Sequence, residues 1–495
     1  MPTRSPTLNN GLRQRSVYRR IGFRIGAIAL GLLPFAFAEA TLRILGLPND
    51  PQKNDPFLDC SEFESLFKQD SEGIYRIPPE RMRLFAPAEF SLKKPSDTRR
   101  VFSLGGSTTQ GEPYGPPTAF AAWLGINLKL IDPSKNWEMI NCGGLSYASY
   151  RVLPILREVL GYNPDLIVLY CGQNEFLEAR ELSGWKKMPT MFAFAASSLS
   201  RLRLVQYTLS SLKPKQNAND EFRTTRLKRE VDALLDSHGG LENYHRSSLN
   251  APAVVASFRW NLQKMVDACE KHRVPLLIIV PTVNLRDCPP FKIETAPTLG
   301  ADKSQQVESL WSQAQDDREE PPLARDSLMK LLELDPQHCG AHYYLGQLAI
   351  SEKDWDRARF HFTAAKDYDV CPLRATSEIQ HTVREIGLKN GVRMLDADQL
   401  FQSNSPHGLV GRAWLIDHVH PGIEGHQLLA ESLANLLIDA NWIKPDRKNW
   451  QDERPDRYRD HLGKLGEDYF IRGKQRLEGL MLWTQGRAKQ IGVEP

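Results

Sequence analysis

The segment that decides the fold is Val101-Phe-Ser-Leu-Gly-Gly-Ser-Thr-Thr109, an apolar run that ends at two glycines and a serine. An apolar run bounded by turn residues predicts a buried strand. Glycine tolerates backbone angles that a side chain forbids, so the chain can turn sharply and present the Ser107 hydroxyl at the carboxyl end of the strand. Because a serine hydroxyl is a poor nucleophile until a base takes its proton, the rest of the chain has to supply a histidine, an orienting carboxylate and oxyanion donors.

Four more apolar runs are expected to form strands, and helical patterns separate them. The strands are expected at 137–142, 165–171, 274–280 and 392–396, with helical segments at 120–130, 260–271 and 424–437 and one that ends near 160. Strands that alternate with helices predict an α/β fold with a parallel sheet flanked by helices.

The composition is that of a globular protein. The chain has 495 residues, of which 41% are hydrophobic and 25% charged, enough to bury a large core and to form two or three units. A formal net charge of +3 gives no reason to expect nucleic acid as a partner. Seven cysteines without CxxC spacing indicate neither a disulfide framework nor a zinc site.

The amino terminus carries a targeting signal. Basic residues up to Arg24 precede an apolar segment, 25–47, that is long enough to cross a hydrocarbon core. The positive charge predicts a single-pass anchor with 1–24 in the cytoplasm and the bulk of the chain outside it, in the periplasm. Two alternatives remain: a cleaved signal peptide, since Ala36-Phe-Ala38 resembles a cleavage site, and an amphipathic soluble helix.

Beyond the anchor, the chain is expected to consist of a split α/β domain with additions. Its last segment, a helical tail, could pack on the core or reach toward a membrane or a second subunit. The expected parts are a polar, proline-punctuated linker at 48–98, the α/β domain at 99–302 and 372–440, a helical insertion in it at 178–250, a second helical insertion at 303–371, and the tail at 441–495.

A period of 34 residues runs through the second insertion. Small and apolar residues recur at the same places in two copies: Ala324, Leu328, Leu331 and Pro336 match Ala358, Phe362, Ala365 and Val370, and Trp311-Ser312 matches Leu345-Gly346. The pattern resembles a pair of tetratricopeptide repeats. It fits the packing of helical hairpins, and it also fits a site for a protein partner. Two repeats are fewer than usually stand alone, so we expect them to lean on the main domain.

The remaining parts of a nucleophilic site occur late in the chain, in Leu415-Ile-Asp417-His418-Val-His420-Pro421-Gly422. On a tight turn ahead of a helix, Asp417 can accept a hydrogen bond from one nitrogen of His420 while the other nitrogen faces a serine. One alternative is a metal site made of His418, His420 and His426 with Asp417. Another is that His420 is only a residue of the turn.

The ordered blocks Gly105-Gly-Ser107, Asn141-Cys-Gly143-Gly144, Gly172-Gln-Asn174 and Asp417-His-Val-His420 together resemble the SGNH (GDSL-like) hydrolase superfamily, from about 99 to 437 without the insertions. With the anchor and the repeat-like insertion, the chain resembles a bacterial, membrane-anchored branch of it. The resemblance implies a flavodoxin-like, three-layer α/β/α fold with a parallel five-stranded sheet.

The resemblance also implies a role for single residues. Ser107 would be the nucleophile, His420 the general base, and Asp417 the residue that holds His420 in the right tautomer. The oxyanion donors would be the side-chain amide of Asn174, the backbone N–H of Ser107 and one residue of the second block, with Gly144 as the first choice and Ser146 as the second. The chain departs from the family's pattern at three positions. Gly106 stands where Asp is usual, and Thr108 where Leu is usual. The family's second-block glycine falls by spacing near Ser146, with Gly143 and Gly144 just upstream.

The function implied by the resemblance is esterase-type acyl transfer from an ester to water or another hydroxyl, with no metal or organic cofactor. An acylated carbohydrate or lipid of the cell envelope is the natural substrate for an anchored enzyme. Two alternatives are an O-acyltransferase that acts on a polysaccharide and a membrane-tethered tetratricopeptide scaffold with vestigial catalytic blocks. Four side chains either line the substrate pocket or satisfy local hydrogen bonds: Glu175, Arg180, Asn284 and Arg286.

Overall fold

The computed structural model describes residues 30, 31, 33–35, 37–42, 65–178, 231–236, 239–246 and 251–485. The chain divides into two compact units, one made of 1–62 and 182–227 and the other of 63–181 and 228–495. The second unit holds all the elements described below except the described part of the predicted anchor.

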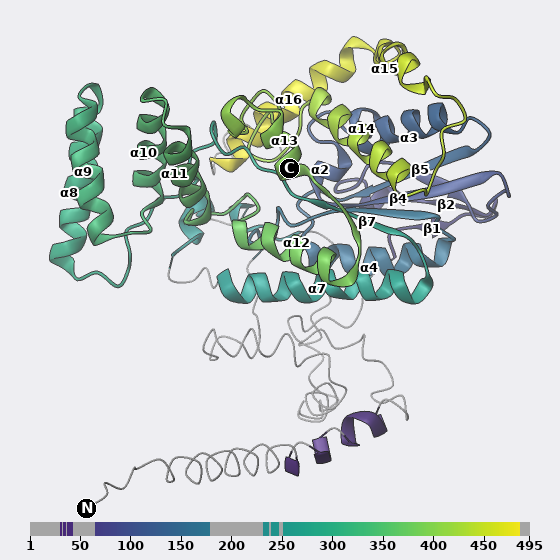
Figure 1. Cartoon of the computed structure of the whole chain (residues 1–495), viewed down its shortest axis with the longest axis horizontal. Helices are drawn as coiled ribbons and strands as arrows, with labels where there is room; N and C mark the ends of the chain where they lie inside the picture. The colour runs from purple at the N-terminus through teal and green to yellow at the C-terminus, as the bar shows by residue number, and fades with distance from the viewer. Residues whose placement is uncertain are drawn as a thin grey trace, which may run out of the picture. The chain divides into compact units, whose positions relative to one another are not determined.

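A five-stranded parallel sheet with the order β5-β4-β6-β7-β8 forms the centre of this unit (Figure 1). Its strands are β4 (Thr98–Gly105), β5 (Asn136–Gly143), β6 (Leu166–Tyr170), β7 (Leu276–Val280) and β8 (Arg393–Asp396). All five lie where the sequence predicts them. In chain order this is the 2-1-3-4-5 arrangement of flavodoxin-like folds. Sheets of this order bind ligands outside the carboxyl ends of the strands where the order reverses, which here is between β4 and β6.

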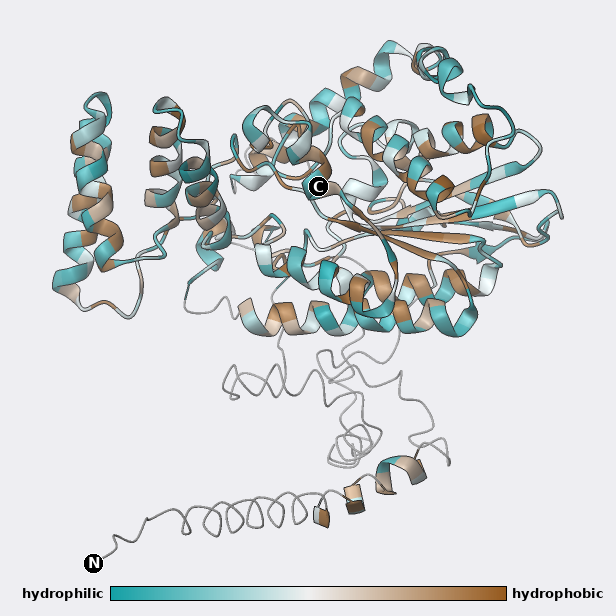
Figure 2. Cartoon of the chain, viewed as in Figure 1, coloured by the Kyte–Doolittle hydropathy of each residue, from teal (hydrophilic) through white to brown (hydrophobic). Residues whose placement is uncertain are grey.

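Two layers of helices cover the sheet, which confirms the predicted three-layer α/β/α fold (Figure 1). Helices α3 (Phe120–Ile131) and α14 (Ile423–Asp439) pack on one face, and α4 (Ser149–Val159), α7 (Ala251–His272) and α12 (Ser377–Asn390) on the other. The strands are largely hydrophobic (Figure 2), and Val101, Val168 and Ile279 pack with Trp123 and Leu429 in one buried cluster. Full burial of one such aliphatic side chain contributes about 1.5–3 kcal/mol.

The region expected to be a linker is folded over its second part. It contains a three-stranded antiparallel sheet of β1 (Lys68–Gln69), β2 (Ile74–Arg76) and β3 (Glu89–Ser91). The ring of Phe90 lies 5.0 Å from that of Phe67 and 5.5 Å from that of Phe102 in β4, centroid to centroid. The linker prediction is therefore wrong over 65–98, because aromatic side chains widely spaced in a polar sequence tie this segment to the α/β core.

The second insertion consists of two helical hairpins (Figure 1). Their helices are α8 (Ala301–Asp316) with α9 (Pro321–Leu334), and α10 (Cys339–Ser351) with α11 (Trp355–Asp367). The 34-residue period marks equivalent buried positions, since the buried residues of α9 correspond to buried residues of α11: Ala324, Leu328 and Leu331 to Ala358, Phe362 and Ala365. Membership in the tetratricopeptide family and a protein partner at this insertion stay predictions.

The carboxyl-terminal tail packs on the α/β core. It contains α15 (Arg454–Gly463) and α16 (Glu467–Thr484), and Trp450 and Tyr458 belong to the main core cluster. The amide Nδ2 of Asn127 donates a hydrogen bond to the Tyr458 hydroxyl over 2.9 Å. In α16, the hydroxyl of Tyr469 lies 2.8 Å from that of Thr118. Of the uses that the sequence left open for the tail, packing on the core is the one observed.

The predicted anchor, 25–47, lies in part outside the described residues, and its described part is helical at 30, 31, 33–35 and 37–42. Within the portion of the chain that the structure describes, no helix combines the length and the apolar character needed to span a bilayer. The anchor and the periplasmic location stay predictions. Most of the first insertion also lies outside the described residues, which include 178, 231–236 and 239–246 of it. They form two short 3-10 turns, η4 (Leu234–Asp236) and η5 (Gly240–Asn243), and an isolated β-bridge between Glu178 and Ala233.

Candidate active site

Ser107 begins a short helix, α2 (Ser107–Gln110), directly after β4. Two glycines allow this turn, because other parts of the chain lie close to them. A Cβ atom on Gly105 would lie 2.0 Å from the carbonyl oxygen of Tyr170, and one on Gly106 would lie 2.6 Å from Nδ2 of Asn174. A side chain at position 106 would therefore force the Asn174 amide to move.

His420 lies between Ser107 and Asp417. Its Nε2 is 2.7 Å from the Ser107 Oγ, and its Nδ1 is 2.6 Å from Asp417 Oδ2. A carboxylate can only accept, so the imidazole carries its proton on Nδ1 and donates it to Asp417. Nε2 is then free to accept the serine proton, which is the tautomer that a general base needs.

A closed turn holds the carboxylate and the imidazole in place ahead of α14. The second oxygen of Asp417, Oδ1, accepts hydrogen bonds from the backbone N–H groups of Val419 and His420, both at 2.8 Å. The Ile416 N–H donates to the His420 carbonyl over 2.9 Å, and the Gly422 N–H donates to the Trp414 carbonyl over 2.8 Å. The spacing of three residues thus brings Asp417 and His420 together, as the sequence predicts.

The environment of this pair favours an ionised carboxylate and a basic imidazole. Burial disfavours the charged form of Asp417, but the neighbouring imidazoles of His420 and His418 and the hydrogen bonds outweigh it and hold its pKa far below the usual range. Burial likewise opposes the charged form of His420, but the Asp417 carboxylate outweighs it and the pKa of His420 lies above its usual value. By contrast, burial lowers the pKa of His418 to about 4, so this imidazole is neutral at pH 7.

Several hydrogen-bond donors lie near the serine. The Asn174 amide Nδ2 donates one of its two hydrogens to the Tyr147 carbonyl over 3.2 Å, and the other has no acceptor among the described residues. The Ser107 N–H stands at the first turn of α2 and makes no hydrogen bond to any residue that the structure describes. Such an N–H is an open donor for a developing oxyanion.

In the segment that begins with Asn141-Cys-Gly143-Gly144, the backbone N–H without a hydrogen-bond partner among the described residues is that of Ser146 and not that of Gly144. The Gly144 N–H donates to the Gly105 carbonyl over 3.1 Å, so the donor favoured from the sequence is already engaged. The Ser146 N–H has no hydrogen-bond partner in the described parts of the chain. Ser146 adopts φ 60°, a left-handed conformation that costs a residue with a side chain about 1–2 kcal/mol. These hydrogen bonds favour Ser146 over Gly144, and which of the two donates to an oxyanion stays a prediction.

Three of the four expected pocket residues have local structural partners, and the fourth, Arg180, lies outside the described residues. Buried Glu175 accepts hydrogen bonds from the N–H and the hydroxyl of Ser149 at 2.8 and 2.9 Å. Buried Asn284 donates from Nδ2 to the Asp417 carbonyl at 2.8 Å. Arg286 is exposed and pairs with Asp287 at 3.1 Å. These contacts favour the alternative of local hydrogen bonding over a substrate pocket.

Glu112 is a charged residue near the triad that the sequence analysis did not single out. Its N–H donates to the Ser107 carbonyl over 3.1 Å, and its carboxylate lies 3.8 Å from the guanidinium of Arg476 in α16. Burial raises the pKa of Glu112 although Arg476 opposes the shift. Glu112 lies in a glycine- and proline-rich loop directly after the candidate nucleophile, and this position is the one feature of the sequence that points to it. The contact with Arg476 in α16 cannot be predicted from the residues around Glu112.

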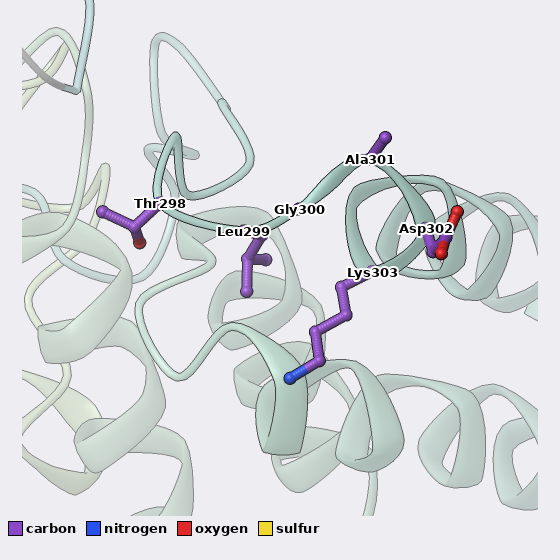
Figure 3. A pocket seen from close by; sticks show the side chains of 6 residues that line it. All are labelled: Thr298, Leu299, Gly300, Ala301, Asp302 and Lys303. Carbon is purple, nitrogen blue, oxygen red and sulfur yellow. The ribbon is translucent and has the colours of Figure 1, made fainter.

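The histidines of the alternative metal site have other partners. His420 faces Ser107 and Asp417, and the Nδ1 of His426 accepts from the Phe120 N–H over 3.2 Å. In the described ranges, no three His, Cys, Asp or Glu side chains are grouped so that they could hold a metal ion. A hollow at the start of α8, lined by residues 298–303, contains none of the candidate catalytic groups (Figure 3).

Comparisons with known proteins give weak similarity to solved structures. No model of a protein family and no curated protein matches the chain. A lipase/acylhydrolase from Enterococcus faecalis is 13% identical, with 70% of this chain and 99% of that chain covered and a TM-score of 0.31. An acetylxylan esterase from Geobacillus stearothermophilus is 11% identical, with 68% and 94% covered and a TM-score of 0.31. At this level of similarity, the fold and the activity of this chain have to be argued from its own coordinates.

Proposed function

We propose that this protein is a serine-dependent hydrolase of carboxylic esters, of the SGNH type. The observation that supports this most directly is the hydrogen-bond line from the Ser107 Oγ through the imidazole of His420 to Asp417, with distances of 2.7 and 2.6 Å. A serine, a correctly oriented imidazole and a carboxylate in this order form the arrangement that activates a hydroxyl for attack on an acyl group.

In the first half-reaction, the Ser107 Oγ attacks the ester carbonyl carbon as His420 Nε2 removes the serine proton. The electron pair of the carbonyl double bond moves to its oxygen, which becomes the oxyanion of a tetrahedral intermediate. The N–H groups of Ser107 and Ser146 and the amide of Asn174 donate to this oxygen. Loss of one such donor typically costs about 2.7–4 kcal/mol of transition-state stabilisation.

Collapse of the intermediate breaks the bond between the acyl carbon and the alcohol oxygen. His420 returns its proton to that oxygen, the alcohol leaves, and the acyl group stays on Ser107 as an ester. Water then attacks the acyl carbon while His420 Nε2 accepts its proton, and the serine leaves with that proton restored. Asp417 keeps its negative charge throughout and stabilises the imidazolium that forms in each step.

The substrate that fits this proposal is an acylated carbohydrate or lipid of the cell envelope. The support comes from the sequence: basic residues up to Arg24 followed by the apolar segment 25–47 favour an anchor with the catalytic unit outside the cytoplasm. The proposal includes a protein partner at the helical insertion, which carries exposed apolar side chains at Leu323, Met329 and Phe360.

Hydrolysis of short-acyl p-nitrophenyl esters by the full-length protein tests the proposal, together with labelling by a fluorophosphonate probe, which requires an activated serine. The Ser107→Ala variant is expected to lose both. Ser134→Ala is a matched control, because Ser134 is exposed and its hydroxyl binds only the neighbouring Asp132 carboxylate among the contacts described. Equal turnover in wild type and Ser107→Ala would refute the proposal. Transfer of the acyl group to a sugar acceptor in place of water would assign the acyltransferase activity.

A further inference from the structure

We propose that the base of the second helical insertion positions the Asp417–His420 turn, with Arg374 and Asn284 as the positioning residues. The inference rests on the proposed function, since it concerns the same triad. Two segments join the insertion to the sheet, one before α8 and one after α11. They contact each other next to the turn and hold it through buried hydrogen bonds.

Asn284 makes the direct contact with the turn. It follows β7 in the segment that leads into the insertion, and it is only 1% exposed. Its side-chain Nδ2 donates to the Asp417 carbonyl over 2.8 Å, and its backbone N–H donates to the His418 carbonyl over 3.0 Å. One residue therefore fixes two successive carbonyl groups, and with them the peptide from which the Asp417 carboxylate projects.

Arg374 holds Asn284 from the other segment, which leaves the insertion after α11. It is 2% exposed, and its Nη1 donates to the carbonyls of Asn284 and Cys288 over 3.0 and 2.7 Å. Its Nη2 lies 3.5 Å from Oδ2 of Asp369, which is also buried and which accepts from the Phe291 N–H over 2.9 Å. A buried guanidinium with carbonyl and carboxylate partners fixes the direction of each group it binds.

A second line of contacts reaches His418. The guanidinium of Arg374 lies 5.8 Å from the ring centroid of Phe291, and the Phe291 ring meets the His418 ring edge to face at 5.3 Å. His418 Nδ1 in turn lies 3.6 Å from Asp417 Oδ1. The insertion itself adds a third contact, because the hydroxyl of Tyr343 in α10 donates to the Arg286 carbonyl over 3.1 Å.

This arrangement predicts which kinetic constant changes. The contacts of Arg374 and Asn284 reach the carboxylate side of His420, whereas the ester meets Ser107 and the oxyanion donors. A shift of the Asp417 peptide therefore weakens proton transfer and not ester binding. Because displacements near 1 Å can cost about a hundredfold in rate, we expect kcat to fall by about tenfold or more in Arg374→Met and Asn284→Ser, with KM changed less than about threefold.

The experiment measures kcat and KM for a p-nitrophenyl ester on the full-length chain, the thermal midpoint, and the low-field proton NMR resonance of His420 Nδ1–H. Arg374→Lys is expected to restore part of kcat because it keeps the cation. Lys366→Met is the matched control, because Lys366 is a cation of similar burial at the end of α11. It pairs with Asp367 and donates to Ala375, Ser377 and Gln380, none of which belongs to the Asp417–His420 turn. It should lower the thermal midpoint and leave kcat and the resonance unchanged.

The inference is overturned if folded Arg374→Met and Asn284→Ser keep the wild-type kcat and resonance. It is also overturned if Lys366→Met, at an equal loss of thermal midpoint, loses as much kcat as Arg374→Met. If Arg374→Met does not fold, Asn284→Ser decides. A wild-type protein that hydrolyses no ester would refute the proposed function but not this inference. The NMR resonance of His420 would still show whether Arg374 and Asn284 position the turn, because it either shifts in the variants or stays in place.

Discussion

His420 Nε2 lies 2.7 Å from the Ser107 Oγ, although 313 positions separate the two residues in the chain. The serine follows β4 at the point where the sheet order reverses, and the histidine stands on the turn that precedes α14. Two loops at the same edge of the sheet therefore meet, and the insertions between them leave this meeting intact.

The Asp417→Asn variant should lose about 10⁴ in kcat. An asparagine presents its amide hydrogens to His420 Nδ1, so the imidazole turns to the tautomer with its proton on Nε2 and can no longer accept the serine proton. The remaining acceptor oxygen can keep the hydrogen bonds from the Val419 and His420 N–H groups, so the turn should persist. Ester turnover and fluorophosphonate labelling measure the loss, and an unchanged thermal midpoint shows that the fold is intact. A loss of less than tenfold would contradict the assigned role.

The pH dependence of kcat/KM should follow His420. Activity requires the neutral imidazole, and the pKa of His420 is raised above the ordinary value of 6.5. Activity should therefore rise with pH, with the midpoint of its acidic limb above that value. A midpoint below the ordinary histidine value would show that burial of the imidazole outweighs the Asp417 carboxylate.

The Glu112→Gln variant should move the same acidic limb to lower pH. The negative charge of Glu112 favours the imidazolium form of His420, so its removal makes His420 easier to deprotonate. Glu308→Gln, an exposed position on α8, removes the same charge from the insertion and should leave the limb in place. Equal midpoints for wild type and Glu112→Gln would show that Arg476 already cancels the effect of this carboxylate.

The strands and the candidate triad were accessible from the sequence for a physical reason. Strands buried on both faces are continuous apolar runs, and glycine breaks mark where they end. The contact of Asp417 with His420 is local, so its spacing carries the information. The order of the strands is a property of the whole sheet, and no single strand encodes it.

Other parts of the site depend on contacts between distant segments. The aromatic residues Phe67 and Phe90 join a polar stretch to the core because Phe102 contacts Phe90 and Tyr162 contacts both of them. The choice between Gly144 and Ser146 depends on which N–H is already bonded, and the partner of Gly144 is the carbonyl of Gly105 in another strand. Coordinates are needed to identify such partners.

The stability of the α/β unit should fall as the pH drops below neutral. Burial lowers the pKa of His418 to about 4 and that of His426 to about 3, whereas both would titrate near 6.5 in the unfolded chain. Between these values the unfolded state binds more protons, so stability is lost as pH falls from about 6.5, by up to about 1.4 kcal/mol per pH unit for each group. Urea unfolding from about pH 7 to pH 5 measures the slope. In His426→Asn, which keeps an acceptor for the Phe120 N–H but does not titrate, the slope should be smaller.

The Asn174→Ala variant should lose about 10²–10³ in kcat with little change in KM, because the amide is expected to donate mainly to the oxyanion of the transition state. The amide also donates to the Tyr147 carbonyl, so a thermal midpoint is needed to separate catalysis from folding. A rise in KM with constant kcat would instead make Asn174 a residue that binds the ground state.

The Ser146→Ala and Ser146→Gly variants should keep nearly full activity, because the proposed donor at this position is the backbone N–H and not the hydroxyl. Glycine relieves the cost of φ 60°, so Ser146→Gly should also raise the free energy of unfolding by up to about 1 kcal/mol. Gly144→Ala should behave differently: a Cβ there would lie 2.8 Å from Phe85 and Tyr147, and the strained contact should lower both stability and turnover. If Ser146→Ala lost as much kcat as Asn174→Ala, the hydroxyl of Ser146 would have to take part in the reaction, and the backbone assignment of the oxyanion donor would be wrong.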